Sequence, residues 1–153
     1  MEIKILKQLE LFNSLGGFVH KGVSMERILA LEQTYNNGNP FPRALRELLY
    51  LAGDYCRYLD KAGADTAEEL QEEARAKLTF AGMTINRPFY CIDTMGDYAA
   101  ARFVILYTDT TNDNPMLCTV NYADNTITEN EKSSISGLIN ARIDDVKNGR
   151  GPF

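Results

Sequence analysis

Apolar residues recur at three- and four-residue steps between Ser24 and Gly53, and this spacing predicts two helices folded back on each other. The hydroxyl of Ser24 can cap the first helix, which we expect to end at Asn36-Asn37-Gly38, where the left-handed backbone is tolerated. The second helix is expected to begin near Pro42, because proline suits a first helical position, and to end at Gly53. Its predicted buried stripe consists of Leu45, Leu48, Leu49 and Ala52.

The same periodicity predicts helices outside this pair. Residues 3–15 place Ile5, Leu9 and Phe12 on one side, and residues 133–147 carry a single apolar face. A capping box from Asp65 to Glu68 opens a helix that runs to about residue 80. The run 54–60 is interpreted as a last helical turn that packs back on the pair. Four glutamates of the 65–80 helix are expected to form a solvated face: Glu68, Glu69, Glu72 and Glu73.

Beyond Gly82 the pattern changes to short β-rich runs. Residues 88–93 and 102–108 are apolar throughout, which is typical of strands covered on both faces, whereas residues 116–122 alternate. A short edge strand is expected at 126–128. We therefore predict an α+β fold with N-terminal helices including a helical hairpin, an antiparallel meander of about four to five strands, and a C-terminal helix.

Three cysteines, Cys56, Cys91 and Cys118, are far apart and odd in number, so free buried thiols in a reducing compartment are predicted. Glu2 and Glu10 interrupt the apolar pattern at the N-terminus, which argues against a signal peptide. No window is long enough to span a bilayer. We therefore expect a cytoplasmic protein.

The net charge is −5, and it is unevenly distributed. The segment from Asp93 to Glu131 has seven acidic residues against one base, Arg102, a net of −6. Such a surface disfavours nucleic acid and anionic membranes as partners and favours a basic protein.

No catalytic residue, metal site or cofactor is predicted. The single histidine, His20, has no nucleophile or acid at a recognisable spacing and is interpreted as structural. The loop that begins at Asp109 fails as a calcium loop, because Asn114 replaces the required glycine and Val120 replaces the twelfth-position glutamate. Glycine-rich phosphate loops are absent. Tyrosines near Asp54 could line a partner pocket, although their helical spacing favours the core: Tyr50, Tyr55 and Tyr58.

A series of short motifs follows a fixed order along residues 24–145. The motifs are Leu31-Glu32, Phe41-Pro42, Leu45, Leu48-Leu49, Ala52-Gly53, Ile85-Asn86-Arg87-Pro88-Phe89, Gly96 before Phe103, and Asp113-Asn114-Pro115. This order resembles the SUKH superfamily, whose fold is shared by a fungal cell-wall-synthesis regulator and many bacterial immunity proteins. The resemblance implies a single domain over 1–153, with 1–23 as an N-terminal extension and 54–82 as an insertion that carries an extra helix.

The resemblance also implies a non-enzymatic binding protein, with toxin neutralisation as the leading role. The partner would be a basic toxin domain, for example that of a nuclease. The acidic segment agrees with such a partner. The contact residues expected on strand ends and loops are Asp93, Asp97, Asp109 and Asp113, with Asp54 and Tyr55 as a second set. Two alternatives stay open at this point: an adaptor that binds a cellular protein, and a small hydrolase that uses two carboxylates in a cleft.

Overall fold

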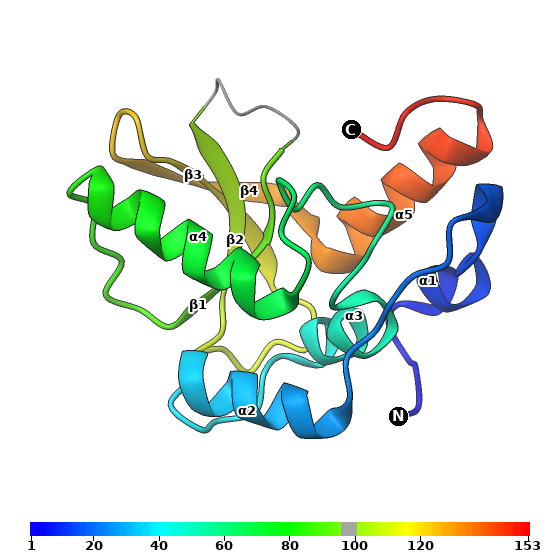
Figure 1. Ribbon diagram of the computed structural model, residues 1–153, viewed down its shortest axis with the longest axis horizontal. Coiled ribbons are helices and arrows are strands. Elements are labelled where there is room, and N and C mark those ends of the chain that lie inside the picture. Colours follow the sequence, from blue (N-terminus) through cyan, green and yellow to red (C-terminus); the bar gives the residue numbers. More distant parts are fainter. Residues whose placement is uncertain (96–100) are drawn as a thin grey trace.

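The computed structural model describes residues 1–95 and 101–153, together with all their side chains except those of 130–132. The chain has an α+β fold with a four-stranded antiparallel sheet in the order β1-β2-β3-β4 (Figure 1). The strands are β1 (Phe89–Asp93), β2 (Arg102–Tyr107), β3 (Met116–Asn121) and β4 (Thr126–Ser134). The helices are α1 (Lys7–Leu11), the short 3₁₀ helix η1 (Leu15–Gly17), α2 (Met25–Tyr35), α3 (Arg43–Ala52), α4 (Ala67–Phe80) and α5 (Ile135–Lys147).

Two hydrophobic cores lie on opposite faces of the sheet. Alternate residues of the strands point to opposite faces, so an unbroken apolar strand supplies both cores. Helix α4 covers one face and is seen in front of β1 and β2 in Figure 1, whereas α1, α2, α3 and α5 pack on the other. The α4 core contains Leu70, Ala74, Leu78, Phe89, Cys91, Phe103, Ile105, Cys118 and Val120.

The edge of the sheet at β1 is closed by side chains of α4. The Gln71 amide donates to the carbonyl of Cys91 at 2.7 Å and accepts from the Cys91 N–H at 2.9 Å. Arg75 donates to the carbonyl of Phe89 at 3.0 Å. These contacts satisfy backbone groups that an uncovered edge strand would offer to another chain. The outer edge of β1 is therefore unsuited to pairing with a partner strand.

The predicted helical pair is confirmed in α2 and α3. The Ser24 hydroxyl accepts from the Arg27 N–H at 3.2 Å, and α2 ends where Asn37 and Gly38 adopt φ of 55° and 78°. Pro42 is the N-cap of α3 and not its first helical residue, so the helix begins one residue later than expected, at Arg43. Gly53 has helical φ. Glycine is required there by the close approach of the backbone, because a Cβ would meet the Leu49 carbonyl oxygen at 2.6 Å. The predicted leucine stripe of α3 is buried throughout: Leu45, Leu48 and Leu49.

Of two further helical predictions in the N-terminal half, one is too long and the other is wrong. Residues 3–15 form a helix only over the five-residue α1: residues 4–6 are non-helical and their amides bind the Glu47 carboxylate of α3, and the helix ends at Leu11. The run 54–60 is not helical either. Its second residue, Tyr55, pairs with Lys21 in an isolated antiparallel bridge.

Smaller differences concern where elements begin and end. The α4 cap lies one residue later than predicted, since the Thr66 hydroxyl accepts from the Glu69 N–H at 3.2 Å and the Glu69 carboxylate accepts from the Asp65 N–H at 2.8 Å. The last strand, β4, extends to Ser134 and is longer than the expected 126–128. The three cysteines are free and buried, as predicted.

Candidate functional site

Among the side chains that the structure describes, four carboxylates are buried, and each has the same kind of environment: one arginine and at least one backbone N–H from another segment. Glu47 of α3 has the largest number of donors. It accepts from the amides of Lys4, Ile5 and Leu6 at 2.8–2.9 Å and from Arg43 at 2.9 Å. Burial alone would raise the pKa of Glu47, but these donors outweigh burial and lower it. The carboxylate therefore fixes the N-terminal segment to α3.

Glu32 and Asp54 anchor the two ends of the helical pair. Glu32 binds the Phe41 N–H at 2.8 Å and a two-pronged Arg46 at 2.5 and 2.8 Å, which holds the turn between α2 and α3. Asp54 binds Arg27 at 2.8 and 2.9 Å and the Ala67 N–H, the first residue of α4, at 3.2 Å. An arginine that binds a carboxylate through two hydrogen bonds fixes the orientation of the carboxylate and also neutralises its charge.

Asp93, at the end of β1, is the fourth buried carboxylate. Its carboxylate pairs with Arg142 of α5 and accepts from the N–H groups of Asp60 and Met95. Arg142 also donates to the carbonyl of Tyr58 at 2.7 Å. The side chain is 0% exposed. Asp93 therefore joins the sheet, α5 and the loop after α3.

These anchors change the predicted contact surface. Asp93 and Asp54 are both buried and paired, so neither presents a carboxylate to a partner in this conformation. Asp97 lies outside the described residues. Asp109 is exposed and pairs with Arg87 at 2.7 and 3.1 Å, which lowers the pKa of Asp109. Asp113 is exposed in the loop between β2 and β3. The −6 segment of the sequence therefore does not form one solvent-facing surface.

A groove of about 340 Å³ lies along the loop that joins α3 to α4, and we call it the loop groove. Tyr55 lines it and is 40% exposed, and Phe153, from the other end of the sequence, also lines it and is 61% exposed. Tyr58, by contrast, is fully buried. The groove is lined by Asp54, Tyr55, Cys56, Arg57, Leu59, Asp60, Lys61, Gly63, Ala64, Asp65 and Phe153.

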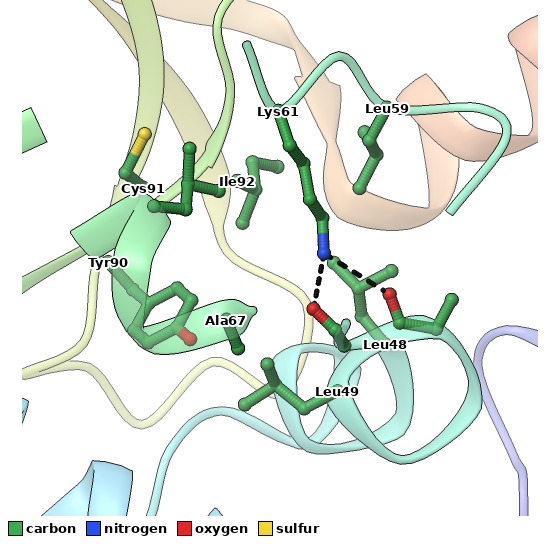
Figure 2. Close-up of a pocket in the computed structure, with 11 residues that line it drawn as sticks. Leu48, Leu49, Leu59, Lys61, Ala67, Tyr90, Cys91 and Ile92 are labelled. Atoms are coloured by element: carbon green, nitrogen blue, oxygen red, sulfur yellow. Dashed lines mark hydrogen bonds between the residues drawn. The ribbon is translucent and has the colours of Figure 1, made fainter. Parts of the chain in front are cut away.

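The Lys61 side chain leaves the loop groove and enters an apolar pocket at the C-terminal end of α3 (Figure 2). Its amine donates to the carbonyls of Gly53 and Ala52. These carbonyls lie at the C-terminal end of α3, where the helix dipole favours a positive charge. Burial lowers the pKa of this amine. The remaining cavity is about 10 Å³, enough for one water. The pocket is therefore a clamp between the loop and α3 and has no room for a substrate.

An acidic ridge runs along the solvent side of α4 and starts at the loop groove. Asp65 lines the groove and also precedes the first turn of α4. The predicted solvated face is confirmed for three of its four glutamates, while Glu68 turns inward and pairs with Arg27. We define the acidic ridge by its exposed members: Asp65, Glu69, Glu72 and Glu73.

His20 is buried against Tyr58, with ring centroids 5.1 Å apart in an edge-on arrangement. Its ring nitrogens have no hydrogen-bond partner among the described residues. Burial, together with the nearby Arg57, lowers the pKa of His20 from 6.5 to about 4. The ring is thus held neutral and serves packing, in agreement with the structural role predicted for it.

The lowered pKa of His20 gives an expected pH dependence. Between pH 6.5 and 4 the unfolded chain binds a proton that the folded chain does not, so the free energy of unfolding falls as the pH falls through this window, by up to about 3 kcal/mol. His20→Phe keeps an aromatic contact with Tyr58 and has no proton to bind. When the free energy of unfolding is measured by urea at several pH values from 7 to 4.5, it should fall less with falling pH for this variant than for the wild type. Parallel curves for the two proteins would contradict the assignment.

No family model, curated protein or solved structure matches the chain. Among residues 1–95 and 101–153, no helix has both the length and the apolar character needed to cross a membrane. Within the same ranges, no group of three or more histidine, cysteine or acidic residues is placed to hold a metal ion.

Proposed function

We propose that the chain is a binding protein of the SUKH type, an immunity protein that neutralises a basic toxin domain. The observation that carries the proposal is the contiguity of the loop groove and the acidic ridge, which share Asp65. The groove adds an exposed tyrosine and an exposed phenylalanine to a charged border. Aromatic anchors beside complementary charge are typical of protein interfaces.

The use that the fold makes of its carboxylates supports binding over acid–base chemistry. Two of the three aspartates that line the loop groove are engaged within the protein. Asp54 is held by Arg27, and Asp60 accepts from Thr94 at 2.6 Å and from the Ala62 N–H at 2.9 Å. Such carboxylates are positioned to stabilise loops. The hydrolase alternative needs two of them free at working distance in a cleft.

The proposed partner follows from charge. Three glutamates of the acidic ridge lie on α4 and face solvent, where they would attract a basic groove and speed the encounter. Toxin identity is the part of the proposal that comes from the SUKH resemblance. An adaptor for a cellular protein would use the same surface, and the identity of the bound protein separates the two roles.

The test is binding to the purified product of a toxin-like reading frame adjacent to the gene, measured at two salt concentrations. The double variant Glu72→Lys/Glu73→Lys should weaken binding at least about tenfold at low salt and reduce its salt dependence. The matched control is Glu10→Lys/Glu26→Lys, which makes the same charge change on exposed residues of α1 and α2. Equal affinities for the two double variants would contradict the surface assignment.

A second variant separates the groove from the ridge. Tyr55→Ala removes an exposed side chain whose backbone pairing with Lys21 is retained. It should speed dissociation from the partner and leave the salt dependence unchanged, because the lost contact is uncharged. Wild-type dissociation kinetics for this variant would remove the loop groove from the interface.

A further inference from the structure

A second groove, of about 350 Å³, lies where the end of α2 meets α4 and the start of β1, and we call it the arginine groove. Two of the segments that border it, the end of α2 and the loop that connects α4 to β1, are on the left side of Figure 1. Two cations, Arg75 and Arg87, line it, although the chain as a whole is acidic. The remaining lining residues are uncharged: Thr34, Tyr35, Asn37, Ile85, Asn86, Pro88 and Phe89.

Arg75, which lines this groove, is held by contacts with several neighbouring residues. Its guanidinium carbon lies 4.3 Å from the ring centroid of Tyr35 and 4.3 Å from that of Phe89. The side chain also donates to the Phe89 carbonyl at 3.0 Å and to the Gln71 carbonyl and side-chain oxygens at 3.3 and 3.2 Å. Aromatic contacts and neutral acceptors orient the guanidinium without neutralising its charge.

The charge of Arg75 is not compensated by a carboxylate of the described residues. Arg27, Arg46 and Arg87 each hold a carboxylate with two hydrogen bonds, and this pairing raises the pKa of all three. For Arg75 the direction is reversed, since burial lowers the pKa. Glu68, which lies on the same helix, is already bound to Arg27. An unpaired, partly desolvated cation is costly, and an external anion would relieve that cost.

The ligand chemistry follows from the charge and the walls. Arg87 is already neutralised by Asp109, and its guanidinium lies 3.9 Å from the Tyr107 ring centroid, so the groove offers one free positive charge. We propose that the arginine groove binds a monocarboxylate with an apolar or aromatic body. The carboxylate accepts from the guanidinium of Arg75, and the body packs against Ile85 and Pro88. Asn37 and Asn86 supply neutral hydrogen-bonding groups at the rim.

Such a carboxylate could belong to a free small molecule or to the C-terminus of a peptide, and paired probes distinguish these sources. Benzoate is compared with benzamide, and N-acetylphenylalanine with its amide, by NMR of the Arg75 side-chain N–H and the amides of Asn37 and Asn86. We expect saturable shifts with one carboxylate or both, at a dissociation constant on the order of 1–10 mM, and none with the neutral partners. The stronger carboxylate identifies the source.

Variants assign the effect to Arg75. Arg75→Gln removes the charge, and Arg75→Lys keeps the charge but loses the planar fork, so each should weaken carboxylate binding at least about tenfold. Arg150→Gln, an exposed arginine on the far C-terminal segment, makes the same net charge change and should bind as the wild type does. If Arg75→Gln fails to fold, Arg75→Lys decides. Absence of carboxylate-specific shifts, or wild-type binding by the folded Arg75 variants, would overturn the proposal. The loop groove and the acidic ridge are unaffected by either result.

Discussion

Glu47→Ala is expected to lower the free energy of unfolding by about 3–5 kcal/mol, as when one partner of a buried, hydrogen-bonded charge pair is removed. The fully buried carboxylate is the acceptor for three consecutive amides and for Arg43. Alanine would leave the buried Leu6 N–H without an acceptor and would remove the shared acceptor of the Lys4 and Ile5 amides and of Arg43. Urea unfolding followed by circular dichroism at pH 7 measures the loss.

Two controls distinguish this anchor from ordinary loss of a side chain. Glu10→Ala, on the exposed side of α1, should change the free energy of unfolding by less than about 0.5 kcal/mol. Because the pKa of Glu47 is lowered from 4.5, its contribution is present above pH 4.5 and is lost as the pH falls further. The difference between wild type and Glu47→Ala should therefore shrink in acid. A difference that is small at pH 7 would mean that the N-terminal segment is held by packing alone.

The pattern of apolar residues was sufficient to predict most of the secondary structure. The helical pair, α4, α5 and the meander of strands were predicted because each depends on a local period and on local signals such as Ser24 or Gly38. The helix predicted over residues 3–15 is confirmed only over Lys7–Leu11. Residues 4–6 are non-helical and donate their amides to Glu47, which lies 41–43 positions away, and no local period indicates such a contact.

The candidate site was harder to predict for the same reason. Asp93 and Asp54 follow an apolar strand and a helix, positions from which an acidic side chain usually reaches solvent. What buries them is an arginine distant in sequence: Arg142 is 49 positions from Asp93, and Arg27 is 27 positions from Asp54. No periodicity connects such pairs. Tyr55, in contrast, is exposed beside a groove, where a partner could reach it.

The acidic residues that do face solvent were visible in the sequence but were assigned no partner. Glu69, Glu72 and Glu73 recur on one side of a predicted helix, and that placement is confirmed. After α3 the chain leaves the helical conformation at Tyr55, and the loop that follows lines the groove before α4 begins. The groove and the helix start are neighbours in sequence through Asp65, and what the fold adds to the groove is Phe153 from the far end of the chain.

Asp93 gives the second large expected effect. Asp93→Ala removes the partner of Arg142 and the acceptor of two loop amides, so we expect a loss of about 3–5 kcal/mol in the free energy of unfolding. The loss should be accompanied by faster amide exchange at Asp60 and Met95, whose N–H groups bind the carboxylate. The matched control is Asp113→Ala, because Asp113 was assigned to the same contact surface by sequence and is exposed.

The central claim is that the buried carboxylates of this protein stabilise its loops and that binding belongs to the exposed acids. It is tested most directly by the free energies of unfolding of Asp93→Ala and Asp113→Ala at pH 7. A loss of several kcal/mol for the first and a change within about 0.5 kcal/mol for the second is the predicted result. Nearly equal, small changes would place Asp93 at the surface and contradict the claim.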